Sequence, residues 1–168
     1  MPTVELPNKL SALLRIAVED AQKIEKTPGY VLDMSVWHSP ANGPCAVCLA
    51  GSVMALRLRA PVADTVDPED YVTVSVHDED DEDNSTRNAL WAIDSMRRAC
   101  LDDAADELDI DITDEQRDAL GDIMSVWHRE YNGRAFLPDG SINLEFKQLR
   151  LEWSEYLAIA DRLEGAGL

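Results

Sequence analysis

Residues 6–26 read LPNKLSALLRIAVEDAQKIEK, and residues 30–38, after the breaker Thr27-Pro28-Gly29, read YVLDMSVWH. In the first stretch the apolar residues recur at helical spacing, and Pro7 suits a first helical turn. The second stretch alternates in the manner of a half-buried strand. A helix followed directly by a strand indicates a domain that mixes the two. The helical stripe comprises Leu6, Leu10, Leu13, Leu14, Ala17, Val18, Ala21 and Ile24.

The next third of the chain predicts a helix, a strand and another helix. Residues 45–59 (CAVCLAGSVMALRLR) are mostly apolar and predict a buried helix. Residues 71–77 (YVTVSVH) predict a strand, because three valines alternate along it. After an acidic run, a helix is expected from Asn84 or Ser85 to about Leu108.

Two more helices are expected toward the end of the chain. Thr113-Asp114-Glu115-Gln116 fits the capping-box pattern and predicts a helix that continues to Tyr131. Residues 141–163 predict the last helix, which ends near Gly165. Because 168 residues are the size of one ordinary domain, residues 1–168 are expected to form a single domain. The predicted fold is a helix-rich α+β domain with about four helices and a small sheet of two or three strands.

Nearly all of the net charge of −18 lies in the acidic segment, residues 64–122. This segment contains 21 carboxylates and four arginines, whereas the other residues contain 12 acids and 11 bases. So many negative charges repel one another and lower the stability of the fold unless a partner or cations neutralise them. The excess of carboxylates also argues against direct binding to DNA, RNA or anionic membranes. The expected partner is a basic protein surface that normally holds nucleic acid.

The carboxylates expected to meet this partner lie in the acidic run and on the helix after it. Asp94, Asp102, Asp106 and Asp109 fall roughly on one helical face. Trp91 beside them would be an anchor if exposed, the alternative being a place in the core. The simpler interpretation, that the acids only keep the protein soluble, stays open. The predicted partner-binding residues are Asp78, Glu79, Asp80, Asp81, Glu82, Asp83, Trp91, Asp94, Asp102, Asp103, Asp106, Glu107 and Asp109.

The stretch Pro44-Cys45-Ala46-Val47-Cys48 is the one most like a motif. Two thiols three residues apart can share a tetrahedral zinc ion, with His38 as a third ligand. Alternatively, a helix that starts here would lower the pKa of Cys45 and create a dithiol redox site. The third interpretation is that both cysteines are small buried hydrophobic residues. No cofactor is expected, and zinc remains the open alternative.

The sequence favours a binding protein over an enzyme, in the cytoplasm. No apolar run approaches the roughly 20 residues that span a bilayer, and the N-terminus does not resemble a signal peptide. An odd number of cysteines, three, fits a reducing compartment. The sequence contains no Walker loop, GxGxxG or GxSxG motif, so neither a hydrolase nor a nucleotide-dependent enzyme has support.

Trp37 and residues 45–55 (CAVCLAGSVMA), together with residues 88–94 (NALWAID), resemble segments of uncharacterised small acidic accessory proteins of tailed phages and prophages. The resemblance covers about a quarter of the chain. It implies expression in the cytoplasm of a bacterial host, and it carries no catalytic residues to transfer. Such proteins commonly bind and block host machinery, sometimes by imitating the charge of DNA. The resemblance therefore implies an anti-defence inhibitor of the DNA-mimic type, and a homodimer stays open.

Overall fold

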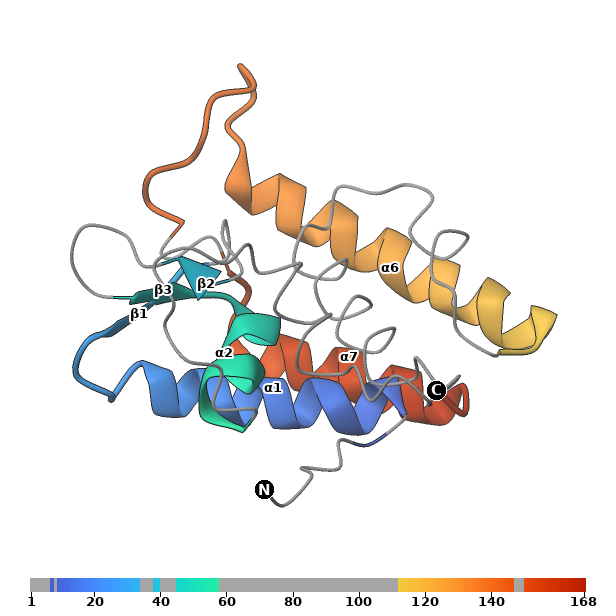
Figure 1. Cartoon of the computed structure of the whole chain (residues 1–168). Helices are drawn as coiled ribbons and strands as arrows, with labels where there is room; N and C mark the ends of the chain where they lie inside the picture. Colours follow the sequence, from blue (N-terminus) through green and yellow to red (C-terminus); the bar gives the residue numbers. More distant parts are fainter. Residues whose placement is uncertain (1–6, 8, 34–37, 40–44, 58–111, 147–149) are drawn as a thin grey trace.

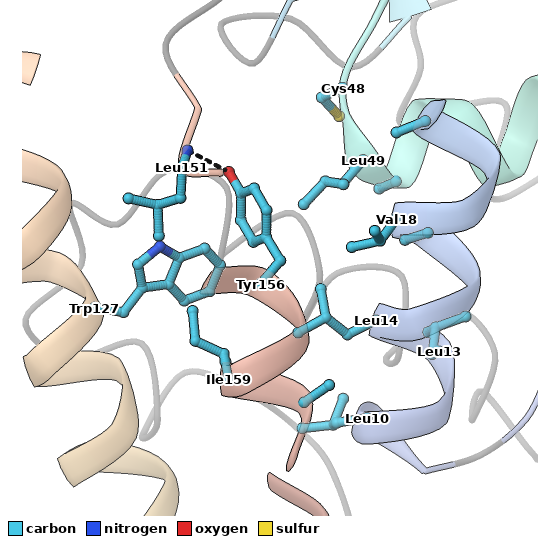
Figure 2. Close-up of a cluster of buried hydrophobic side chains, with 14 of the residues drawn as sticks. Leu10, Leu13, Leu14, Val18, Cys48, Leu49, Trp127, Leu151, Tyr156 and Ile159 are labelled. Carbon is cyan, nitrogen blue, oxygen red and sulfur yellow. Dashed lines mark hydrogen bonds between the residues drawn. The ribbon is translucent and has the colours of Figure 1, made fainter. Parts of the chain in front are cut away.

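The computed structural model describes residues 7, 9–33, 38–39, 45–57, 112–146 and 150–168. α7 lies between α1 and α6, while α2 and a small sheet cover one end of α1 (Figures 1 and 2). The described residues thus form the helix-rich α+β fold that the sequence predicted. In chain order the elements are α1 (Leu10–Ile24), β1 (Tyr30–Leu32), β2 (His38–Ser39), β3 (Cys45–Val47), α2 (Leu49–Leu56), α6 (Asp114–Ala135) and α7 (Trp153–Gly165).

The core forms where α1, α2, α6 and α7 meet around Tyr156. Tyr156 is 1% exposed, and its ring makes an edge contact with Trp127 of α6 at 5.6 Å between centroids. Its hydroxyl accepts a hydrogen bond from the backbone N–H of Leu151, so its polar end is satisfied (Figure 2). Leu14 of α1 and Leu49 of α2 approach from the other side. Burying one such leucine stabilises the fold by about 2 kcal/mol, which explains why the predicted stripe of α1 faces inward.

Polar contacts join both ends of α1 to α7 and to the residues that flank α7. The Ser11 hydroxyl donates to the backbone oxygen of Leu168 at 2.5 Å, near the start of α1. The Arg15 guanidinium contacts the carboxylates of Asp161 and Glu164 at 2.7 and 2.8 Å. Beyond the other end of α1, Glu25 pairs with Arg150 at 3.1 Å. The first and last described helices therefore form one unit.

The sheet has the strand order β1-β3-β2. β1 pairs with β3 in parallel, with Tyr30 opposite Cys45, whereas β2 pairs with β3 antiparallel, with His38 opposite Val47. β1 and β2 therefore run in opposite directions on the two sides of β3. The prediction of one continuous strand over residues 30–38 is wrong, because the chain reverses direction between Leu32 and His38.

The prediction of a helix over residues 45–59 is also wrong in its first part. Cys45–Val47 is the central strand β3, and α2 begins at Leu49. Cys48 between them has extended backbone angles, and its Sγ accepts a hydrogen bond from the N–H of Gly51 at 3.4 Å. A fully apolar run suits a buried strand as well as a buried helix, so its pattern does not separate the two.

The capping box predicted at Thr113 is confirmed. The Thr113 hydroxyl accepts from the N–H of Gln116 at 3.2 Å, and the Gln116 side chain accepts from the N–H of Thr113 at 2.9 Å. Two of the N–H groups that a helix start leaves without partners are thereby satisfied. α6 runs 22 residues from this cap, to Ala135.

The last helix is shorter than predicted, because α7 begins at Trp153 rather than near residue 141. Residues 136–146 instead form a hairpin, in which Phe136 and Ile142 make an antiparallel bridge. Gly140 in its turn has a φ of 84°, a conformation that suits glycine. Asn143 holds the hairpin to the end of α6, since its side chain donates to the carbonyl of Arg134 at 2.9 Å.

Several predictions fall on residues outside those described: the strand at 71–77, the acidic run at 78–83 and the helix from 84 or 85 to 108. The single domain over residues 1–168 stays a prediction. Within the described ranges, no helix combines the length and apolarity that a membrane crossing requires.

Candidate functional site

The predicted partner-binding residues all lie within 58–111, outside the described residues. The last part of the acidic segment, residues 112–122, is described and opens α6. This is the part of the predicted surface whose geometry can be built. The set that lies outside is Asp78, Glu79, Asp80, Asp81, Glu82, Asp83, Trp91, Asp94, Asp102, Asp103, Asp106, Glu107 and Asp109.

Four exposed carboxylates form what we call the α6 stripe: Asp114, Glu115, Asp118 and Asp122. Residues four apart on a helix lie on one face about 6 Å apart, so the three aspartates make a row. The opposite face of α6 is buried against the core through Leu120, Ile123, Met124 and Trp127. Core packing therefore turns the stripe outward.

The α6 stripe differs from the other helical acids in its pairing. None of its four carboxylates makes an ion pair with a described residue. By contrast, five acids of α1 and α7 each lie within 2.8 Å of a basic nitrogen. These paired acids are Glu19, Asp20, Glu155, Asp161 and Glu164. The stripe therefore presents charge that the described part of the fold does not neutralise.

The density of charge on the stripe is close to that of one nucleic-acid strand. From Asp114 to Asp122 the helix rises about 12 Å, so four carboxylates give about one charge per 3–4 Å. One strand of duplex DNA carries one phosphate per about 3.4 Å. Arg117 lies within the stripe and lowers the net density to about one charge per 4 Å. The stripe can therefore imitate one strand over a short distance.

Cys45 and Cys48 are both buried. Cys45 lies on β3, and burial raises the pKa of its thiol. A redox nucleophile needs the opposite shift, which the sequence analysis expected from a helix that starts at Cys45. That helix starts at Leu49 instead, and Cys48 is the residue that caps it. The geometry fits cysteines that act as packing and capping residues.

The proposed third zinc ligand, His38, lies on β2, where its backbone pairs with Val47 between the two cysteines. The sheet thus brings the three residues into one neighbourhood, as the zinc interpretation requires. Within the described ranges, no group of three His, Cys, Asp or Glu side chains is placed to hold a metal ion. The zinc interpretation therefore rests on the strand register alone.

Two of the four tryptophans, Trp127 and Trp153, lie among the described residues. Trp127 lies in the core at 2% exposure, although its indole N–H has no acceptor among the described residues. Trp153 is partly buried, and the Arg150 guanidinium stacks on its ring at 3.9 Å. Trp37 and Trp91 lie outside the described residues. The anchor role predicted for Trp91 stays a prediction.

Two features of the described surface were not singled out from the sequence. The first is the α6 stripe, whose signal was the i, i+4, i+8 spacing of Asp114, Asp118 and Asp122 after a capping box. The second is the 136–146 hairpin, whose signal was the turn sequence Pro138-Asp139-Gly140 between apolar residues. Comparisons with protein-family models, with curated proteins and with solved structures found no match to the chain.

Proposed function

We propose that this chain is a non-catalytic acidic binding protein that docks on a basic, normally nucleic-acid-binding surface of a bacterial host protein, as a DNA mimic. One observation carries the proposal. The described end of the acidic segment displays four exposed carboxylates that make no ion pair with a described residue, whereas the acids of α1 and α7 are paired. The 17 carboxylates of residues 64–111 would extend the same surface.

Unpaired surface charge contributes little to the stability of the fold, but it strongly raises the rate at which the protein associates with an oppositely charged partner. Exposed carboxylates in a row repel one another, and a complementary basic surface relieves this repulsion. Charge complementarity raises association rates and selects partners, and both effects weaken as salt shortens the Debye length. A protein face that accepts phosphates at about 3.4 Å spacing is the natural complement of the stripe.

The proposal is tested by reversing charge on the stripe and comparing a variant with the same total change elsewhere. Asp118→Lys with Asp122→Lys changes the net charge by four units on the stripe. Glu130→Lys with Ser154→Lys and Ala158→Lys makes the same change of four units at exposed positions outside the acidic segment. Each protein is immobilised, exposed to a bacterial lysate and washed, and the captured proteins are identified by mass spectrometry. The main captured protein is then purified and its affinity for each variant measured.

We expect the main captured protein to bind nucleic acid, and the unaltered chain to displace a labelled DNA duplex from it. The stripe variant should bind this protein at least about tenfold more weakly, because a few desolvated charge contacts are lost. The control should stay within about twofold, since exposed pairs contribute little. The proposal is wrong if both variants bind equally well, or if capture is unchanged between low salt and about 0.5 M salt.

The alternative, a zinc or dithiol site at Cys45 and Cys48 with His38, is favoured by the register that sets His38 opposite Val47. Elemental analysis of protein purified without chelator decides the zinc version. Less than about 0.2 equivalents of zinc would remove it, since four-coordinate structural sites hold their metal tightly. Absence of insulin-reduction activity would remove the dithiol version.

A further inference from the structure

The 136–146 hairpin projects from the body of the molecule at the end of α6. Figure 1 shows the chain rising away from α1 and α7 after α6 before it returns to start α7. Its base is fixed by the ring of Phe146, which meets Tyr131 of α6 edge-on at 5.5 Å. The hairpin is thus an extension of α6, the helix that carries the α6 stripe at its other end.

Hydrogen bonds within the hairpin hold its shape. The N–H of Leu137 donates to the carbonyl of Ser141 at 2.8 Å, and the N–H of Gly140 donates to the carbonyl of Leu137 at 2.8 Å. The Asp139 carboxylate accepts from both the N–H and the hydroxyl of Ser141 at 2.9 and 2.6 Å, and these bonds lower the pKa of Asp139. A hairpin held in this way loses little conformational entropy on binding.

The hairpin exposes more large apolar side chains than any other described segment. Leu144 is 92% exposed, and Ile142 is 55% exposed directly across the bridge from Phe136. Opposite residues of an antiparallel pair have Cβ atoms about 5 Å apart, so Phe136 and Ile142 form one apolar spot. Gathered exposed apolar groups mark interaction sites, whereas scattered ones do not. The exposed apolar residues of the hairpin are Phe136, Leu137, Ile142 and Leu144.

We propose that these hairpin side chains insert into an apolar depression beside the basic surface of the same host protein, and that this contact sets how slowly the complex dissociates. The inference rests on the proposed function. Charge-driven docking supplies association rate and selectivity, but slow dissociation comes from a few well-buried apolar anchors. The α6 stripe consists of carboxylates and contains no such apolar anchor. The hairpin, which directly follows α6, supplies one.

The charge of the chain identifies the occupant. Each copy of the chain has a net charge of −18, so electrostatic repulsion opposes a homodimer that forms through the hairpin. A basic partner is attracted instead of repelled. α6 is about 33 Å long, so stripe and hairpin can contact one partner at two places. The partner is therefore a basic protein whose phosphate-binding surface ends in an apolar depression.

The test places a photo-crosslinking amino acid, benzoylphenylalanine, at position 118 on the stripe or at position 144 on the hairpin. Both positions are exposed, so folding is unaffected. Each full-length protein is irradiated in a bacterial lysate, and its crosslinked products are identified by mass spectrometry. We expect the same basic nucleic-acid-binding protein from both positions.

Kinetics with that purified protein then separate the two contacts. Ile142→Ser with Leu144→Ser should raise the dissociation rate at least about tenfold and leave the salt dependence of association unchanged, because loss of a central apolar anchor acts on dissociation. Leu157→Ser, an exposed apolar residue of α7 outside the hairpin, is the control and should change dissociation less than about twofold.

Each outcome decides between the proposals. A basic protein crosslinked from 118 but not from 144, or an unchanged dissociation rate in the hairpin variant, overturns the hairpin inference and leaves the proposed function standing. A crosslink from 144 to a second copy of this chain, or to a different protein, overturns it too. If 118 captures no basic protein, the proposed function fails and the hairpin inference fails with it.

Discussion

The acids of α1 and α7 and the acids of the α6 stripe have the same chemistry but different surroundings. Each paired acid makes an ion pair with an arginine or lysine, so its charge is neutralised within the folded chain. The stripe sits opposite the buried face of α6, and its carboxylates make no ion pair with a described residue, although Arg117 lies among them in the sequence. Removing a paired acid should therefore weaken the fold, whereas removing a stripe acid should not. We call the ion-paired acids of α1 and α7 structural charge, and the unpaired acids of the α6 stripe presented charge, because they remain available to a partner.

The largest effect is expected at Asp20, which is 1% exposed and receives two hydrogen bonds from Arg57 at 2.6 and 3.1 Å. Asp20→Ala should lower the free energy of unfolding by about 3 kcal/mol, because the partly buried Arg57 guanidinium loses its buried, hydrogen-bonded partner and keeps only Glu19 at 4.0 Å. Glu19→Ala, at the next and exposed position, should lower it by less than about 1 kcal/mol. Urea unfolding of both variants measures this. Equal small losses would show that pairing does not hold α1 to α2.

A smaller effect is expected at Glu155, whose pKa is lowered chiefly by its hydrogen bond from Arg134. Its side chain also accepts from the N–H of Glu152 at 2.8 Å in the capping box of α7. Glu155→Gln should lower the free energy of unfolding by about 1 kcal/mol at pH 7. Since the pKa is depressed in the folded state, the stabilisation is present above the ordinary value of 4.5 and is lost as pH falls through the lowered value.

Urea unfolding at pH 7 and at pH 3 checks this sign. The two proteins should differ at pH 7 and converge at pH 3, where the carboxyl is increasingly protonated in both states. Glu130→Gln is the matched control, because Glu130 also faces Arg134 but at 3.5 Å and fully on the surface. A difference between Glu155→Gln and the parent that grows as pH falls would contradict the assignment.

The smallest effect, of opposite sign, is expected on the stripe. Asp118 has like charges four residues away on both sides, at Asp114 and Asp122. Asp118→Asn should raise the free energy of unfolding by about 0.3–0.5 kcal/mol, because like charges at this spacing repel. The gain should shrink in about 0.5 M salt. If Asp118→Asn destabilises the protein by as much as Glu155→Gln, the stripe is part of the structural charge and the comparison fails.

Local signals in the sequence predicted helices well wherever a cap or an amphipathic stripe was present. Thr113 and Gln116 marked the start of α6, and the leucines at 10, 13 and 14 marked the buried face of α1. The run from Cys45 was misassigned, because whether it is strand or helix depends on the strands that pair with it. The run from Ser141 was misassigned because Asn143 makes its bonds back to Arg134 and Ala135.

The negative charge of the candidate site could be predicted from the sequence, but the arrangement of its carboxylates in space could not. The excess of carboxylates in residues 64–122 is evident from composition. Which of them face outward depends on the core, since Leu120 and Ile123 turn Asp118 and Asp122 to the opposite side. The exposure of Leu144 could not be predicted at all, because apolar residues are expected inside unless a partner covers them.

The contacts between α1 and α7 also determine when the protein can fold during synthesis. Ser11 and Leu168 are 157 residues apart, and Glu25 and Arg150 are 125 apart. The apolar face of α1 is therefore synthesised well before α7, the helix against which it packs. Contacts this distant in sequence slow folding.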